Sequence, residues 1–304
     1  MHRVATRRSC PEDQATRLTR CSPAEIHMNL ITIIACHNRR ELTVRAVQQT
    51  QTAAAVAGVT PRFVVFDDGS SDGTAEALRA LEADVTILTG DGSAYWASGM
   101  AQAERAALGS KTTEPEDFIL WLNDDVQLHE NAVVGLLAQV PNGDAVVVGA
   151  MRDPEDGTIT YSGLERAGRH PLNYRRVTPG EKPVRVETFN GNCVLVPVSI
   201  AHRLGGIDGK FSHALADIDY GLRCNKIGIP VLLAPRTAGT CARNNEQTYS
   251  TAKAAWAAFT GSKGGGNFSS LRRVLRRTNP KTWWTVMIAT YSLWWLRRIF
   301  RFAS

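Results

Sequence analysis

Two acidic clusters in the first half of the chain have residue types that bind nucleotides and divalent cations. Residues 67–74 read Asp-Asp-Gly-Ser-Ser-Asp-Gly-Thr, and their carboxylates can accept hydrogen bonds from a base or a ribose. Residues 123–125 read Asn-Asp-Asp, whose neighbouring carboxylates suit Mg²⁺ or Mn²⁺ shared with a substrate diphosphate. Each cluster alone is also compatible with a turn, and the first with a helix N-cap at Ser71 or Asp72.

A third segment that could do chemistry, residues 211–223, fits an amphipathic helix with two aspartates. Its predicted apolar face consists of Leu215, Ile218 and Leu222. Asp219 stands four residues before Arg223, where the two can form an ion pair. Asp217 and Asp219 point apart, because two helical steps turn the chain by about 200°. We therefore expect Asp219 to be structural, and Asp217 to be either a general base for a hydroxyl group or an N-cap.

The elements that must position these side chains are those of an α/β fold. Short β-branched runs alternate with amphipathic stretches, which predicts a mixed, mainly parallel central sheet flanked by helices. Expected strands cover residues 30–35, 63–66, 85–88, 118–122 and 145–148, and expected helices cover 41–57, 74–81, 97–108 and 130–140. Both acidic clusters follow a strand. Because ligands of open α/β sheets bind beyond the carboxyl ends of the strands, the clusters are expected to share one site.

The second half of the chain has a different character. Gly, Pro and Arg punctuate residues 152–183, which predicts loops or short antiparallel strands before a strand at 194–196 and a helix at 216–226. We expect three regions: a disordered leader, a main domain of two halves, and a flexible linker with a helical C-terminal tail. Their boundaries are 1–27, 28–260 (halves 28–150 and 151–260) and 261–304.

Charge and composition narrow the class of protein. The chain has 304 residues, of which 43% are hydrophobic and 21% charged, so it is neither disordered nor collagen-like. The net charge is +6; residues 1–28 contribute +2 and residues 261–304 contribute +9, which leaves −5 for residues 29–260. Six cysteines without a CxxC spacing favour a reducing cytoplasm, and residues 1–27 lack the apolar run of a secretory signal.

The tail contains an apolar, tryptophan-rich run at residues 283–296 with basic residues on both sides. Fourteen residues are too few for a spanning helix, which needs about 20. Tryptophan and arginine favour the surface of an anionic membrane, so peripheral membrane contact is one expectation. The alternative is that Trp283, Trp284, Trp294 and Trp295 pack the tail onto the main domain. Nucleic acid is not expected as a partner, because the aromatic residues are not interleaved with the basic ones.

In their order along the chain, these segments resemble the family 2 glycosyltransferases with the GT-A fold, over residues 28–245. The resemblance begins with the first strand and the residues that follow it, 37–39, and continues through 67–74, 123–125 and 217–223. It is strongest with the rhamnosyltransferase-type branch. His37 stands where the family often has tyrosine, Asn123 where an acidic residue is usual, and Ala216 where a glutamate is frequent.

The resemblance implies an inverting, metal-dependent glycosyltransferase of the hexosyltransferase type. It would move a sugar from a UDP- or dTDP-sugar to a hydroxyl of a glycan or lipid-linked acceptor in cell-surface polysaccharide synthesis, on the inner face of the membrane. Residues 28–150 would bind the donor and 151–260 the acceptor. The implied donor-binding residues are His37, Asn38, Arg39, Asp67, Asp68, Ser70, Asn123 and Asp124. Asp125 would hold Mg²⁺ or Mn²⁺, and Asp217 would deprotonate the acceptor.

Two further segments are expected to shape the sugar and acceptor pocket. They contribute Tyr95 and Trp96 from one segment, and Asn190, Gly191 and Asn192 from the other. Ordinary core packing for the aromatic pair, and a turn for the amide segment, are the alternatives.

Two other functions stay open at this point. A sugar-phosphate nucleotidyltransferase is disfavoured because residues 35–40, after the first strand, lack the glycine-rich loop which that class needs. A non-catalytic nucleotide- or sugar-binding module would use the acidic clusters only to hold a ligand. A Rossmann dinucleotide site is disfavoured, because no strand–helix junction carries GxGxxG.

Overall fold

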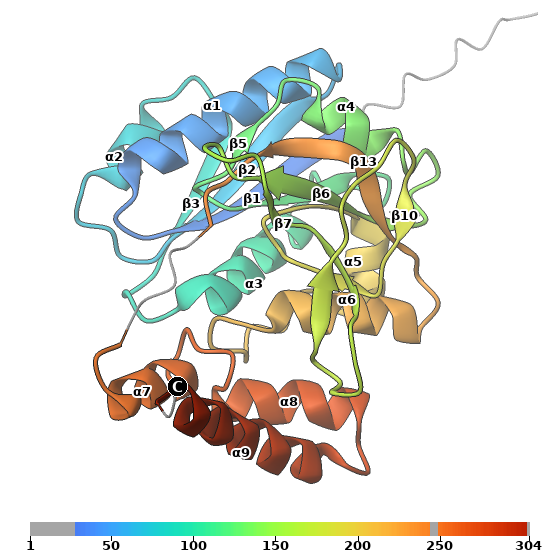
Figure 1. Cartoon of the computed structure of the whole chain (residues 1–304). Helices are drawn as coiled ribbons and strands as arrows, with labels where there is room; N and C mark the ends of the chain where they lie inside the picture. The colour runs from blue at the N-terminus through green and yellow to red at the C-terminus, as the bar shows by residue number, and fades with distance from the viewer. Residues whose placement is uncertain (1–27, 244–248, 303–304) are drawn as a thin grey trace, which may run out of the picture.

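A mixed, mainly parallel sheet forms the centre of the molecule, as predicted, and helices cover both of its faces (Figure 1). The computed structural model describes residues 28–243 and 249–302, and for residues 299–302 the backbone alone. The expected leader, residues 1–27, lies outside the described residues.

The first half of the chain alternates strands and helices close to the predicted positions. Its elements are β1 (Asn29–Cys36), α1 (Arg40–Val56), β2 (Thr60–Asp67), α2 (Thr74–Arg79), β3 (Val85–Thr89), α3 (Tyr95–Leu108), β4 (Phe118–Leu122), β5 (Gln127–Leu128), α4 (Ala132–Leu137) and β6 (Val146–Arg152). The four expected helices are present, although α4 is shorter than predicted at both ends.

The second half begins with short strands and ends in helices. Its elements are β7 (Ile159–Tyr161), β8 (Gly163–Arg166), β9 (Tyr174–Arg176), β10 (Val184–Arg185), β11 (Thr188–Phe189), β12 (Cys193–Pro197), α5 (Val198–Leu204), α6 (Ala216–Lys226), β13 (Val231–Thr240), α7 (Ala252–Thr260), α8 (Phe268–Thr278) and α9 (Trp283–Phe302). The short antiparallel strands, β12 and α6 are present as predicted, whereas α5 and β13 are not among the predicted elements.

Both halves of the chain contribute to the central sheet. Its strand order is β10-β13-β6-β12-β4-β1-β2-β3, with β5 and β7 added beside β13 and β6. β1 pairs in parallel with both β2 and β4, so the acidic segments after β2 and β4 lie on either side of the end of β1. β12 is antiparallel between β4 and β6, and a second, small sheet consists of β11, β8 and β9.

Two apolar clusters hold the helices to the sheet. One packs residues of α1, α2 and α4 against one face, and the other packs α3, α5, α6 and α8 against the opposite face. β4 reads Phe-Ile-Leu-Trp-Leu and is buried along its whole length, because helices cover it on both sides. Trp121 of β4 lies at the centre of the second cluster, with its ring 4.7 Å from that of Tyr220 of α6.

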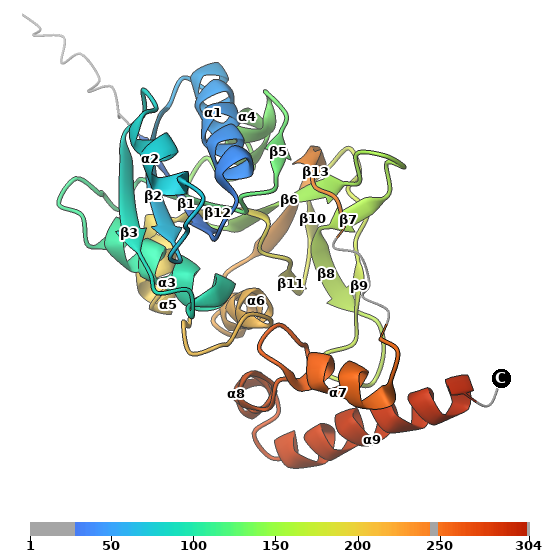
Figure 2. The ribbon, with the colours of Figure 1, turned by 90° about the vertical axis from the view of Figure 1, so that its left-hand side faces the viewer.

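The C-terminal helices lie below the main body, where α8 contacts α6 (Figures 1 and 2). α8 buries Leu271, Val274 and Leu275. Its Arg273 and Arg277 pair with aspartates, whereas its other two arginines lie over the ring of Trp283. Trp283 packs against the core, and Trp294 and Trp295 both pack against Trp256 of α7. Trp284 is 54% exposed, and Trp295 stays 39% exposed despite its contact with α7. The tail therefore both packs on the domain and keeps exposed aromatic surface. In the part of the chain that the structure describes, no helix has the length and apolarity needed to cross a bilayer.

Candidate functional site

The end of β2 is held by the backbone around it. Asp67 Oδ1 accepts a hydrogen bond from Ser70 N at 2.9 Å. Asp68, which is only 6% exposed, accepts from Gly92 N at 2.9 Å and from Ala94 N and Tyr95 N at 3.0 Å. This carboxylate therefore shapes the loop between β3 and α3. The expected contact of Asp68 with a base or ribose stays a prediction.

The loop after β1 is joined to the same turn. His37 Nδ1 donates to the Asp68 carbonyl at 2.7 Å, and Asn38 N donates to Ser70 Oγ at 2.8 Å. Asn38 Oδ1 accepts from Ser71 N at 2.8 Å. Asp72 accepts from Arg40 N and Thr74 N. The N-cap of α2 is Gly73, so the alternative of an N-cap at Ser71 or Asp72 is wrong. The structure thus brings the predicted donor residues of the first two strands into contact.

Arg39 bridges the second acidic cluster. Its Nη1 donates to Asp124 Oδ1 at 2.9 Å and to Asp125 Oδ2 at 3.2 Å. Burial raises the pKa of Asp124 to about 6, although the Arg39 charge opposes that rise. Cys241 Sγ, from beyond β13, donates to Asp125 Oδ1 at 3.5 Å. This cysteine is not predictable from the spacing of the cluster, because it lies 116 residues away along the chain.

The two carboxylates fit a cation that is shared with a substrate. Within residues 28–243 and 249–302, no three His, Cys, Asp or Glu side chains gather as a metal site. Mg²⁺ commonly takes one or two protein carboxylates and completes its coordination with phosphate oxygens and water. Asp124 and Asp125 offer that kind of incomplete ligand set.

Asp217 lies in the first turn of α6. Its Oδ2 accepts from Gly191 N at 3.1 Å and its Oδ1 from Ile218 N at 2.8 Å. The N-cap position is Leu215, so Asp217 is not the N-cap that the sequence leaves as the alternative. Burial raises the pKa of Asp217 above its ordinary value of 3.8. General bases often have a pKa that burial has raised in this way.

Trp96 connects the two sides of the site. Its Nε1 donates to Asn123 Oδ1 at 2.8 Å, and its ring lies against Gly191, where an added Cβ would come within 2.7 Å of it. The same Cβ would lie 3.2 Å from Asp217 Cβ, so glycine is needed for this close approach. Asn123 N donates to Asn192 O at 3.0 Å. Trp96 and the 190–192 segment thus join the Asn-Asp-Asp cluster to Asp217.

Backbone strain is concentrated around the site. Four non-glycine residues in the described part of the chain have a positive φ, and three of them are Asn38, Tyr95 and Leu215, at +51°, +53° and +78°. Each stands in one of the segments described above. Such conformations cost about 1–3 kcal/mol each, which marks these segments as functional candidates.

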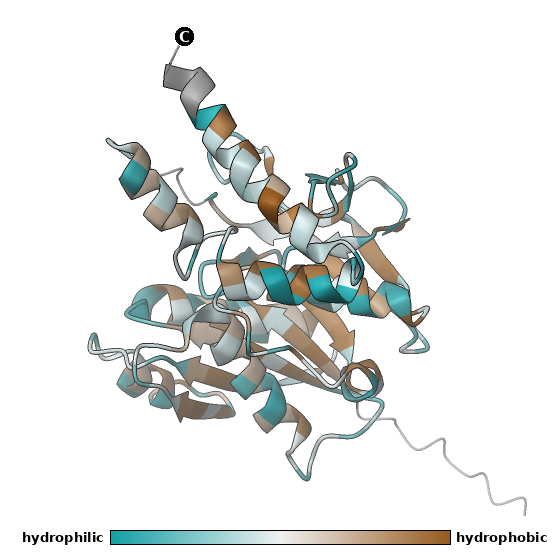
Figure 3. Ribbon diagram, turned by 90° about the horizontal axis from the view of Figure 1, so that it is seen from below, coloured by the Kyte–Doolittle hydropathy of each residue, from teal (hydrophilic) through white to brown (hydrophobic). Residues whose placement is uncertain are grey.

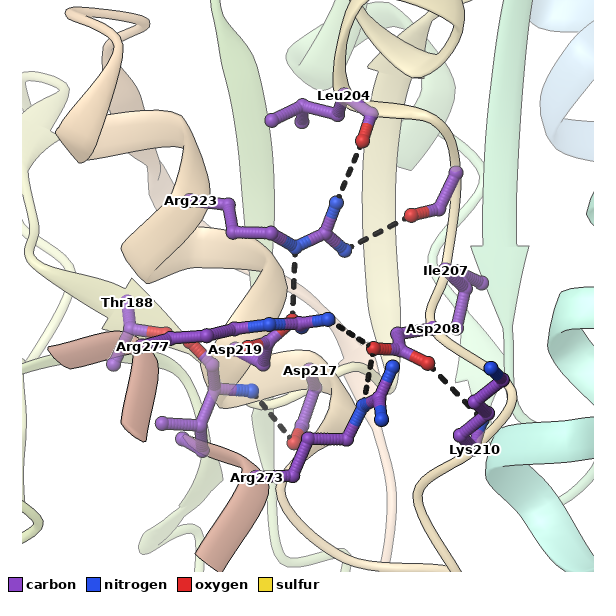
Figure 4. Close-up of polar contacts among 12 residues, drawn as sticks. Thr188, Leu204, Ile207, Asp208, Lys210, Asp217, Asp219, Arg223, Arg273 and Arg277 are labelled. Carbon is purple, nitrogen blue, oxygen red and sulfur yellow. Dashed lines mark hydrogen bonds and ion pairs between the residues drawn. The ribbon is translucent and has the colours of Figure 1, made fainter. Parts of the chain in front are cut away.

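Asp219 is structural, as predicted (Figure 4). It is 1% exposed and accepts from Arg223 Nε at 2.8 Å and from Arg277 Nη1 at 2.6 Å. The predicted apolar face of α6 is wrong in part. Leu215 precedes the helix and Leu222 is half-buried, while the buried side of α6 carries Ala216, Tyr220 and Cys224. The edge-to-face contact of Tyr220 with Trp121 holds this side of α6 against the sheet.

Two open cavities flank these residues. One, of about 680 Å³, lies between the loop after β3 and the segment before α6, and is lined by Tyr95, Phe211 and Ser212. The other, of about 620 Å³, lies between β9 and the start of α6, and is lined by Asn190 and Leu215. The predicted pocket residues Tyr95 and Asn190 therefore line two different cavities.

The sequence of this chain is similar to those of known glycosyltransferases. The model of glycosyl transferase family 2 matches residues 32–204. The chain is 31% identical over 191 residues to N-acetylglucosaminyl-diphospho-decaprenol L-rhamnosyltransferase of Mycobacterium tuberculosis. That match covers 54% of this chain and 61% of the relative, so the chain spans about three fifths of the relative's length.

Solved structures show the same fold at low sequence identity. GalNAc-T7 with UDP, GalNAc and Mn²⁺ gives a TM-score of 0.56 at 14% identity, covering 83% of this chain and 48% of the other. Residues 1–349 of S. aureus TarS in complex with UDP-GlcNAc give a TM-score of 0.51 at 11% identity. That match covers 74% of this chain and 61% of the TarS chain. These similarities confirm the predicted GT-A fold.

Proposed function

The chain belongs to glycosyl transferase family 2, and from this membership we propose that it transfers a sugar from a nucleotide-diphosphate donor to a hydroxyl group. The observation that carries the proposal is the position of Trp96, which hydrogen-bonds Asn123 and packs against Gly191. Through these contacts the proposed cation ligands and the proposed base, Asp217, are parts of one site.

In this proposal the two sides of the site have separate tasks. Residues 28–150 bind a UDP- or dTDP-sugar, with His37, Asn38, Ser70 and the carboxylates after β2 positioning the nucleoside. Asp124 and Asp125 hold Mg²⁺ or Mn²⁺, which neutralises charge on the leaving diphosphate. Asp217 removes the proton from the acceptor hydroxyl, which then attacks the anomeric carbon in line with the diphosphate and inverts the configuration.

The acceptor side belongs to residues 151–260. The relative's name describes transfer of L-rhamnose to a lipid-linked diphosphate sugar. We extend to this chain a glycan or lipid-linked acceptor, a role in cell-surface polysaccharide synthesis, and a place on the inner face of the membrane. The exposed tryptophans and basic residues of the tail support contact with that membrane.

A thermal-shift panel of UDP-, dTDP- and GDP-sugars, each with and without Mn²⁺, tests the donor side, because a ligand of the folded state raises the unfolding midpoint. We expect one UDP- or dTDP-sugar to stabilise the protein and Mn²⁺ to increase the effect. A panel with no shift would contradict the proposal.

Hydrolysis of the bound donor then separates an enzyme from a binding module. We expect slow, metal-dependent release of sugar that Asp217→Asn removes, while the donor shift of that variant stays. Binding without any turnover by the parent protein would favour the binding module.

A further inference from the structure

The cavity between β9 and α6 has an unusual lining for the body of this chain. Residues 29–260 carry a net charge of −5, but the charged residues that line this cavity are Arg175 and Arg176. Much of the remaining wall is apolar and comes from Leu164, Leu172 and Leu215, with Tyr174 beside them. The wall of this cavity therefore combines basic side chains with apolar ones.

The two arginines of the cavity differ in their partners. Arg175 pairs with Glu165 at 2.9 Å. Arg176 is exposed and forms no ion pair or hydrogen bond with the side chains that the structure describes. In β9 it lies opposite Leu164, which also lines the cavity. One positive charge is thus left without a protein partner at the wall of an apolar cavity.

The cavity also adjoins the proposed base. Asn190 lines it and directly precedes Gly191, whose N–H donates to Asp217. Leu215 and Ile218, on either side of Asp217 in sequence, line it as well. A ligand in this cavity therefore lies next to the segment that holds Asp217.

The same hairpin leads to the C-terminal tail. Figure 2 shows β8 and β9 running from the main sheet towards α9. At the tip of the hairpin, His170 Nε2 and Thr290 Oγ1 of α9 are 2.8 Å apart. The wall that carries Arg176 thus extends to the helix whose exposed apolar residues are proposed to face the membrane.

We propose that Arg176 binds a phosphate group of the acceptor and that this cavity is the acceptor subsite. The inference rests on the proposed function and adds the chemical class that the subsite recognises: an anionic phosphate next to an apolar chain. Guanidinium groups bind phosphate through paired N–H donors, and a guanidinium without a carboxylate partner is free to do so. The apolar wall accommodates the first carbons of a lipid, and the sugar at the other end of the phosphate reaches towards Asp217.

Calorimetric titration with citronellyl-diphospho-N-acetylglucosamine, a soluble probe, tests this subsite. We expect Arg176→Ala to raise the dissociation constant about tenfold, as for the loss of one charged hydrogen-bonded contact. Arg176→Lys should recover part of the affinity because it restores the charge. The matched control is Arg45→Ala, an exposed arginine of α1, which should leave the affinity unchanged.

A second probe isolates the phosphate. Octyl N-acetylglucosaminide has a sugar and an apolar chain but no phosphate, so Arg176→Ala should not change its affinity. Equal affinity of the parent protein and Arg176→Ala for the diphosphate probe would overturn the inference, as would no binding of that probe by the parent protein. If the donor panel still shows a metal-dependent shift in either case, the failure concerns this subsite and not the proposed glycosyl transfer.

Discussion

Arg277 Nη1 of α8 lies 2.6 Å from Asp219 Oδ2 of α6, and this ion pair ties the C-terminal helices to the helix that carries Asp217 (Figure 4). The same guanidinium also donates to Asp208, which in turn accepts from Arg273 Nε at 2.5 Å. Seen from below, α8 and the helix leading to the C-terminus cover this part of the molecule (Figure 3). The tail is therefore a structural part of the proposed acceptor side.

We predict that Arg277→Ala lowers the free energy of unfolding by about 2 kcal/mol, the range for hydrogen bonds to buried charged groups. Asp219 is 1% exposed and would keep Arg223 but lose its second cation. Urea denaturation followed by tryptophan fluorescence measures the change. Lys281→Ala, an exposed basic residue just before α9, should match the parent protein; an equal loss in both variants would contradict the prediction.

The pH dependence of transfer should reveal the environment of Asp217. A general base must be ionised, so the rate falls as the pH drops through its pKa, and burial moves that pKa above 3.8. We expect the acid limb of kcat, measured at saturating donor and metal, to lie above the range of an ordinary aspartate. An acid limb of kcat in the pH range of an ordinary aspartate would argue against Asp217 as the base.

Removal of one cation ligand should separate metal binding from nucleotide binding. We predict that Asp125→Ala abolishes the Mn²⁺-dependent part of the donor thermal shift, and that EDTA then has no further effect. Asp84→Ala removes an exposed carboxylate ahead of β3 and serves as the control. A donor shift that still depends on Mn²⁺ in Asp125→Ala would assign the metal elsewhere.

Arg39 should compete with free metal. Its guanidinium neutralises Asp124 and Asp125, so Arg39→Gln should tighten binding of Mn²⁺ alone by roughly two- to fivefold, the scale of a partly exposed ion pair. Electron paramagnetic resonance titration of Mn²⁺ measures this. Arg40→Gln changes the neighbouring exposed arginine, whose side chain lies near Gly73, and should have no effect. Weaker Mn²⁺ binding by Arg39→Gln would refute the competition.

The tail should bind anionic vesicles. Trp284, Ile288 and Trp295 are exposed and fall within about 40° of one another around α9, since each residue turns a helix by about 100°. Exchanging all three for glutamine should reduce co-sedimentation with vesicles that contain phosphatidylglycerol. Neutral phosphatidylcholine vesicles should bind the parent protein less, because residues 261–304 contain nine basic residues and no acidic ones.

A matched triple variant controls for the loss of exposed apolar area. It replaces Val56, Val134 and Ile227, which are exposed on the main body, with glutamine. This variant should sediment like the parent protein. Equal sedimentation of the α9 variant and the parent protein would indicate that the tail is not the membrane contact.

The sequence predicts those parts of the fold and site that depend on near neighbours along the chain. The ends of β1 and β2 meet because the strands are parallel and adjacent, which brings Cys36 and Asp67 into register. The pair of Asp219 and Arg223 follows from their spacing of four residues on a helix. The strand register and the ion pair both follow from residues that are close together along the chain.

The remaining features depend on contacts between distant segments. Arg277 is 58 residues from Asp219, and no helical period relates the two. β13 pairs with β6, about 85 residues earlier, and its sequence includes Ala-Pro-Arg, which breaks the strand pattern with register shifts. The orientation of α6 depends on the ring of Trp121, in another strand, and not on the apolar spacing within the helix itself.

The strand order also has a consequence for synthesis of the protein on the ribosome. β6 ends at Arg152, but its two neighbours, β12 and β13, end at Pro197 and Thr240. A nascent chain that stops after β6 therefore exposes both edges of β6 and one edge of β4, and unpaired strand edges favour aggregation. All strands of the central sheet are available only after translation has passed residue 240. The donor half and the acceptor half must therefore fold together.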